Sequence, residues 1–116
     1  MSTTTLPPLA ERVAAGAALL DRHQPGWATQ VDPTLLDMQD PRADVLGQLY
    51  GSFDTGVRQL IPAPLGDLED DWICDHAFDI DDAQLVRPDG PVAAYQELTC
   101  AWRLELARRR KGGDQG

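Results

Sequence analysis

Two histidines and two cysteines are the side chains in this chain best suited to catalysis, but their spacing forms no nucleophile–base pair. His76 follows Cys74 by two residues, and side chains two apart on a helix do not face one another. His23 stands at the expected end of a helix, where a cation suits the helix dipole. A catalytic triad needs a nucleophile, a base and an orienting acid. The sequence therefore predicts no catalytic residues and no enzyme.

Metal-binding side chains are also present, without the spacing that metal sites use. Cys74, His76, Asp79 and Asp81 could donate ligands, but the paired cysteines of common zinc sites are missing. The acidic run from Asp67 to Asp82 lacks the central glycine and final glutamate of a calcium-binding EF-hand loop. No glycine-rich phosphate loop with its lysine occurs either. We predict no metal site and no cofactor, with weak adventitious calcium binding as the alternative.

Acidic side chains give the strongest signal, because they are concentrated in one segment. The chain carries 19 acidic and 10 basic residues, for a net charge of −9. Residues 67–90 hold nine acids and one arginine, with large apolar side chains between the acids. Aromatic anchors surrounded by charge are typical of protein interfaces. The predicted partner-binding residues are Asp70, Asp71, Trp72, Asp75, Phe78, Asp81 and Asp82. The alternative is a solvated surface loop beside a small packed helix.

These observations favour a small non-enzymatic interaction protein, an accessory or modulator with a partner protein of basic character. One alternative is an acidic inhibitor that mimics nucleic acid and occupies the DNA- or RNA-binding site of its partner. Another is a nucleic-acid-binding regulator that uses the basic run Arg108–Lys111 of the last helix. Acids elsewhere on the chain would repel phosphates, which disfavours nucleic-acid binding. The oligomeric state stays open, a homodimer included.

The expected compartment is the cytoplasm. The first 20 residues lack the basic start and unbroken apolar core of a secretory signal. No apolar run approaches the roughly 20 residues of a membrane span. Only Cys74 and Cys100 are present, and we expect two free thiols, each a small buried side chain.

The helices that must position these residues form an all-α single domain. We expect four or five helices, three of them substantial, over residues 6–111, with flexible ends at 1–5 and 112–116. The first helix follows Pro8 and ends before Pro25, and a short helix covers 67–77. Asp40-Pro41 and Asp89-Gly90-Pro91 predict the starts of the second main helix and of the last helix. The predicted stripe of the last helix at helical spacing is Val92, Tyr95, Leu98 or Thr99, Trp102 and Leu106. The best strand candidate, Ala83–Val86, is too short to support a sheet.

Two glycines interrupt the second main helix. Gly47 and Gly51 lie four apart in Val45–Phe53, although a glycine costs a helix about 1 kcal/mol relative to alanine. Small residues let helices approach closely. We predict that this helix packs against the alanine-rich first helix, within one chain or across a dimer, with a simple kink as the alternative. Trp27, after the first helix, is predicted to fill the core.

Four short motifs carry a resemblance to a group of proteins. The motifs are Gly16–Asp21, Pro25–Trp27, Val45–Gly51, and the pair Tyr95 and Trp102 in the closing helix. Over most of residues 13–108 the chain resembles a group of short uncharacterised proteins from actinobacteria and their phages. A His-Gly-Phe element of that group resembles His76–Phe78, with Ala77 at the glycine, and a cysteine often stands where this chain has Ala43 or Asp44. The resemblance implies a phage or mobile-element origin and carries over no catalytic residue.

Overall fold

The structure is a computed structural model that describes residues 8–61, 69–80, 88 and 90–113. Every regular element in those ranges is a helix, so the all-α class is confirmed. The helices are α1 (Leu9–His23), α2 (Trp27–Gln30), α3 (Val45–Tyr50), α4 (Phe53–Leu60), α5 (Glu69–Asp75) and α7 (Gly90–Gly113). The described part thus has six helices where we expected four or five. The expected flexible residues 1–5 and the strand candidate 83–86 lie outside the described residues.

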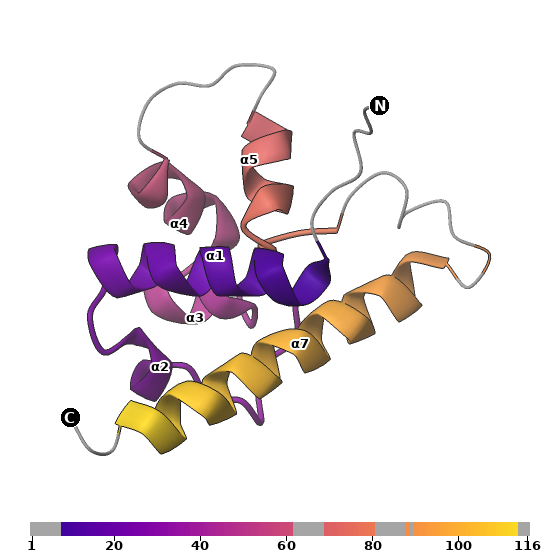
Figure 1. The fold of residues 1–116 in the computed structure, drawn as a ribbon. Helices are drawn as coiled ribbons and strands as arrows, with labels where there is room; N and C mark the ends of the chain where they lie inside the picture. Colours follow the sequence, from indigo (N-terminus) through magenta and orange to yellow (C-terminus); the bar gives the residue numbers. More distant parts are fainter. Residues whose placement is uncertain (1–7, 62–68, 81–87, 89, 114–116) are drawn as a thin grey trace, which may run out of the picture.

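The two longest helices, α1 and α7, cross each other and form the frame of the fold (Figure 1). The first helix also contacts α5, while α2 contacts both α7 and α3. Helices α3 and α4 pack together behind α1, with α4 above it and α3 below it in the view of Figure 1. No helix of the described residues is long and apolar enough to cross a membrane.

The core is centred on Trp102 of α7, which is fully buried. Its ring meets Trp27 edge-on and stacks on Phe78, with 5.8 Å between ring centroids in both pairs. Its indole Nε1 donates a hydrogen bond to the carbonyl of Ala77 at 2.7 Å. One side chain therefore joins α7 to α2 and to the turn after α5. The core position predicted for Trp27 is confirmed.

The first helix and the last helix begin and end close to the predicted residues. Helix α1 starts directly after Pro8 and buries Val13, Ala17 and Leu20. Helix α7 starts at Gly90 and runs through the glycine pair 112–113, which we placed in the flexible end. The short helix within 67–77 is present as α5.

The second main helix is two helices, and its start differs from the prediction. Asp40 accepts a hydrogen bond from the Arg42 amide and so closes a turn. Asp44, four residues later, is the N-cap of α3 and accepts from the Gly47 amide. Gly51, at φ +96°, then ends α3, and Ser52 caps α4. The left-handed conformation favours glycine, so Gly51 marks a break between helices.

The close approach at Gly47 is real, but its neighbour is not α1. A Cβ at Gly47 would collide with the backbone of Pro41 and Arg42, in the turn that precedes α3. On α1 the close contact is at Gly16, where a Cβ would collide with the carbonyl of His76. The predicted packing of the two small-residue surfaces on each other is therefore wrong within one chain, and packing across a dimer stays a prediction. Each surface accommodates a different loop.

This difference predicts unequal effects of two alanine substitutions. Gly47→Ala should lower the free energy of unfolding by about 1–3 kcal/mol, because the new methyl group must displace backbone. Gly51→Ala should cost about 1 kcal/mol, because only the left-handed conformation opposes it and nothing lies within 4 Å of its Cβ. Urea unfolding of both variants measures the difference. A Gly47→Ala variant as stable as the natural chain would contradict the close approach.

Candidate functional site

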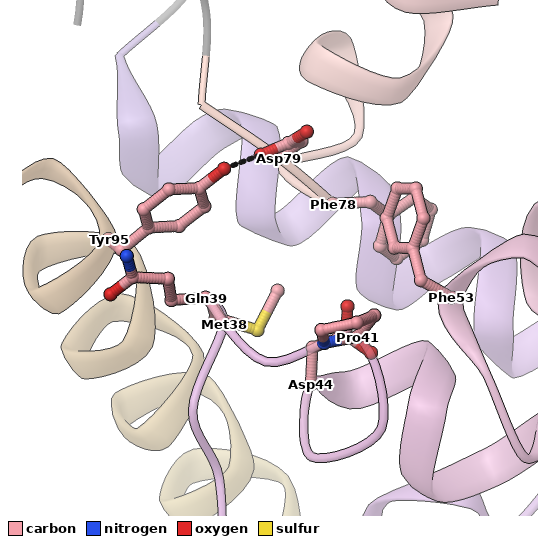
Figure 2. Close-up of a pocket in the computed structure, with 8 residues that line it drawn as sticks. All are labelled: Met38, Gln39, Pro41, Asp44, Phe53, Phe78, Asp79 and Tyr95. Atoms are coloured by element: carbon pink, nitrogen blue, oxygen red, sulfur yellow. Dashed lines mark hydrogen bonds between the residues drawn. The ribbon is translucent and has the colours of Figure 1, made fainter. Parts of the chain in front are cut away.

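A pocket of about 210 Å³ lies where the turn after α5 meets α7 and the loop before α3 (Figure 2). Its polar lining comes from Asp44, Asp79, Tyr95 and Gln39. The apolar lining includes Met38 and the rings of Phe53 and Phe78. Residues from four separate segments of the chain therefore meet at one concave site.

Asp44 is the most unusual of these groups, because its carboxyl is 2% exposed. It sits at the N-cap of α3, where its Oδ1 accepts from the Gly47 amide. Burial raises the pKa of Asp44 to about 7, against the lowering effect of that hydrogen bond, and the charges of Asp79 and Asp40 raise it further. Asp44 lines the pocket, and its carboxyl therefore gains or loses a proton near neutral pH.

Asp79 is held at the pocket by two donors to one oxygen. The Tyr95 hydroxyl donates to Asp79 Oδ1 at 2.8 Å (Figure 2). The Ile80 amide donates to the same oxygen, also at 2.8 Å. Burial, the hydrogen bond to Asp79 and nearby negative charge raise the pKa of Tyr95, so the phenol stays a donor. No hydrogen bond to Asp79 Oδ2 occurs within the described ranges.

This arrangement fits a small organic cation better than a metal ion. No group of three His, Cys, Asp or Glu side chains among the described residues could hold a metal. Two carboxyls in one pocket repel each other when both are charged. A guanidinium or ammonium group would supply donors and offset that repulsion, and aromatic walls attract cations. The volume suits the end of an arginine or lysine side chain.

The predicted partner-binding residues are only partly brought together. Asp71 and Asp75 are exposed on α5. Trp72 is half-buried, and its ring lies against that of His76, tilted by 40° with 4.6 Å between centroids. Phe78 is 1% exposed. Its ring belongs to the core and to one wall of the pocket, so it is not part of an outer binding surface. The side chain of Asp70, and Asp81 and Asp82 altogether, lie outside the described residues.

The sequence reasoning did not single out Asp44 or Tyr95 as site residues, and considered Asp79 only as a metal ligand. Asp44 directly precedes the apolar run Val45-Leu46, which is an N-cap signal. Nothing in the sequence marks that cap as buried, since carboxyls are seldom buried without a partner. The cysteine prediction also fails in part, because Cys100 is exposed and Cys74 is half-buried, although both are free thiols.

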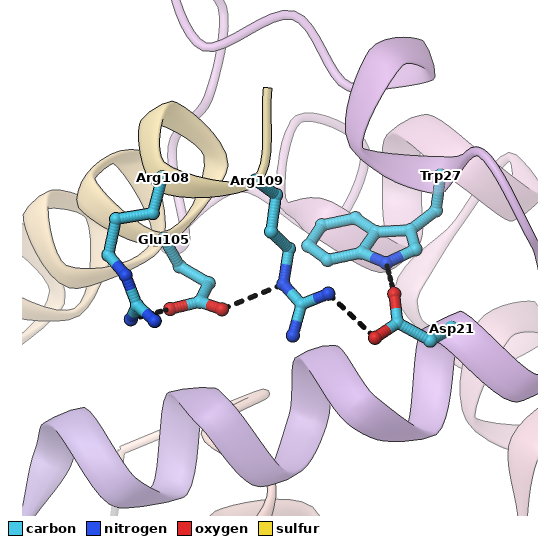
Figure 3. Close-up of polar contacts among 5 residues, drawn as sticks. All are labelled: Asp21, Trp27, Glu105, Arg108 and Arg109. Carbon is cyan, nitrogen blue, oxygen red and sulfur yellow. Dashed lines mark hydrogen bonds and ion pairs between the residues drawn. The ribbon is translucent and has the colours of Figure 1, made fainter. Parts of the chain in front are cut away.

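The basic end of α7 is occupied by contacts within the chain (Figure 3). Buried Glu105 pairs with Arg108 at 2.8 Å and with Arg109 at 2.7 Å. Arg109 also pairs with Asp21 at 2.6 Å and lies over the ring of Trp27. The Trp27 indole donates to the same Asp21 carboxylate at 2.9 Å. These contacts fasten the end of α7 to α1 and α2.

Arg110 completes this attachment by donating to two backbone carbonyls. Its guanidinium bonds Ala28 O at 2.9 Å and Val31 O at 2.6 Å, just where α2 ends. Of the three arginines, Arg108 alone is largely exposed, at 74%. Arg109 and Arg110 therefore act as a structural clamp that holds the end of α7 against α1 and α2.

The fold and the pocket define a small all-α protein with two carboxyls at one partly buried site. Comparisons with protein-family models, with curated proteins and with solved structures find no match. The resemblance to the actinobacterial and phage proteins stays a prediction, and the function proposed below depends on the pocket.

Proposed function

We propose that this is a non-enzymatic interaction protein that binds a basic partner protein by taking one arginine or lysine side chain into the Asp44–Asp79 pocket. The observation that carries the proposal is the convergence of two carboxyls, one of them buried, on a concave site with aromatic walls. The acidic segment predicted from the sequence contributes Asp79 to this site. The exposed acids Asp71 and Asp75 lie outside the pocket.

Ionising a carboxyl in this pocket costs free energy as long as no cation is bound. Burial destabilises the charged form of Asp44, and the charge of Asp79 in the same pocket adds to that cost. A cation that enters the pocket is attracted to the Asp79 carboxylate and favours the ionised form of Asp44. Apolar walls restrict water and strengthen that attraction. Binding energy therefore comes from relieving an unfavourable arrangement that the fold maintains.

The overall charge supports the same class of partner. A net charge of −9 attracts basic surfaces and raises their rate of association. On α5, exposed Asp71 and Asp75 extend the negative surface. We place the interaction in the cytoplasm and in a phage or mobile-element setting, as the free thiols and the resemblance suggest. The alternative of a nucleic-acid-binding regulator is less favoured, because Arg109 and Arg110 at the basic end of α7 bond within the chain.

Selection from a displayed library of random peptides tests the proposal. Peptides that bind the natural chain should share an arginine or lysine, and Asp79→Asn should weaken them at least about tenfold, the effect of losing one charge-assisted contact. Asp54→Asn removes the same charge from an exposed position on α4 and should leave binding within about twofold. Asp71→Asn tests the exposed acidic segment separately.

Three results would contradict the pocket. If the selected peptides contain no basic residue, the pocket does not bind an arginine or lysine side chain. Equal weakening by Asp54→Asn and Asp79→Asn would mean that only total charge matters. If Asp71→Asn loses binding while Asp79→Asn binds fully, the partner contacts the exposed surface of α5 and not the pocket. If DNA displaces this chain from a captured partner, the partner site is a nucleic-acid site and the acidic-mimic alternative gains support.

A further inference from the structure

A groove of about 690 Å³ lies between α7 and the loop before α3. The loop and the helix run in opposite directions. Arg103 of α7 donates to the carbonyls of Pro33 and Leu36, at 3.0 and 3.1 Å. Four residues earlier on α7, the Thr99 hydroxyl accepts from the amide of Met38, which lies two residues further along the loop. Each step forward along the loop is therefore a step back along the helix.

The groove has an exposed apolar side chain at each end. Leu35 directly precedes one of the residues whose carbonyls Arg103 contacts, so it lies at the arginine end. Val92, three residues before Tyr95 on α7, lies at the other end. The two side chains are 64% and 52% exposed, and they are two of the three large apolar side chains that the described residues leave exposed. One surface therefore leaves two apolar groups in water at its opposite ends.

The two ends of the groove also differ in charge. Tyr95 lines both the groove and the acidic pocket, so the end with Val92 adjoins the two carboxyls of the pocket. The end with Leu35 carries Arg103, and no carboxylate within the described ranges pairs with that arginine. Asp37 lines the groove between the ends, and its Oδ1 accepts from a backbone amide of the same loop at 3.0 Å.

We infer that this face binds a second copy of the chain, in a symmetric dimer in which Leu35 of each copy packs on Val92 of the other. A two-fold axis midway between the two side chains exchanges the ends of the groove. The same operation turns the Arg103 end of one copy toward the acidic end of the other. Apolar and charged groups are thus matched together, as an interface between identical surfaces requires. The inference goes beyond the proposed function and does not depend on what the pocket binds.

The expected dimer is weak. Its apolar part consists of two Leu35–Val92 contacts, and small contact areas are typical of transient complexes. Each copy carries a net charge of −9, which opposes association outside the matched surface. At about 0.15 M salt, exposed charges more than about 8 Å apart are largely screened. We therefore expect a dissociation constant of about 10–100 µM at that salt concentration.

Sedimentation equilibrium of the folded full chain, from well below to well above this concentration, tests the dimer. We expect a monomer that becomes a dimer, with the amide NMR shifts of Leu35 and Val92 changing along the same curve. Leu104→Glu is the control, because Leu104 is 68% exposed on α7 and lies outside the groove. This variant should dimerise as the natural chain does.

Two complementary variants test which side chains meet. Leu35→Lys and Val92→Glu each place a charge against an apolar side chain at both contacts of the dimer, so each alone should dimerise at least about tenfold more weakly. In an equimolar mixture, one contact joins the new lysine to the new glutamate, and the other keeps the natural leucine and valine. The mixture should therefore recover the natural affinity. Both positions are exposed, so neither change should unfold the chain.

Three results would overturn the inference. A natural chain that stays monomeric over the whole range forms no such dimer. A dimer that Leu35→Lys and Val92→Glu form as tightly as the natural chain uses another face. A mixture that associates no better than either variant alone shows that Leu35 and Val92 do not meet across the dimer. The pocket is tested separately, by the effect of Asp79→Asn on the selected peptides.

Discussion

Replacing Trp102 by alanine is expected to lower the free energy of unfolding by about 3–5 kcal/mol, the usual range for losing a fully buried tryptophan. The ring contacts Trp27 and Phe78, and its Nε1 satisfies the Ala77 carbonyl. Losing it leaves a cavity and a buried carbonyl without its donor. Because small domains are stable by only about 5–15 kcal/mol, this variant should be close to unfolding at room temperature.

Trp102→Phe separates the hydrogen bond from the packing. It keeps a ring in place and should cost less, about 1–3 kcal/mol, mainly through the unsatisfied Ala77 carbonyl. Leu104→Ala, at an exposed position two residues away on the same helix, is the matched control and should change stability by less than about 0.5 kcal/mol. Urea unfolding compares all three. Equal effects of Trp102→Ala and Leu104→Ala would contradict the described core.

Asp44→Asn is expected to stabilise the protein by about 2–4 kcal/mol at pH 8 and to have little effect near pH 4. The folded pKa, about 7, exceeds the unfolded value of 3.8. Between these values the folded state holds a proton that the unfolded state has lost, so the contribution of Asp44 to stability falls as pH rises from 4 to 7. Asparagine does not ionise, so the variant does not lose stability in this way as pH rises. Its side-chain oxygen can still cap α3.

The measurement is the free energy of unfolding of both chains at pH 4, 6 and 8. The advantage of Asp44→Asn should grow steadily across that series. Asp54→Asn, at an exposed carboxyl, controls for the change in net charge. If Asp44→Asn raises the free energy of unfolding by the same amount at all three pH values, the folded pKa of Asp44 is not raised by its burial.

The helices could be predicted from the sequence where local signals agree with tertiary packing. Proline before Leu9 and the spacing of Val13 and Ala17 define α1 without reference to the rest of the chain. The α3–α4 region could not be predicted in this way. Whether Gly51 sits inside a helix or ends it depends on its φ angle, and the loop that collides with a Cβ at Gly47 is placed by tertiary structure.

The pocket could not be predicted because its residues are distant in the sequence. Asp44, Asp79 and Tyr95 come from three elements, and no spacing rule connects them. Composition and charge did indicate a basic partner, which is a property of the whole chain. Which carboxyls are buried is a property of packing. The exposed acids of α5 dominated the sequence signal, whereas the buried Asp44 gave almost none.

The most direct test of the pocket follows the carboxyl carbon of Asp44 by NMR across pH, with and without an arginine-containing peptide selected for binding to the natural chain. We expect the pKa of Asp44 to be about 7 in the free protein. With the peptide bound, it should fall by at least about one unit, because a cation beside a carboxyl favours its charged form. A peptide that binds while the pKa of Asp44 stays at about 7 would contradict the claim that the pocket takes up a basic side chain.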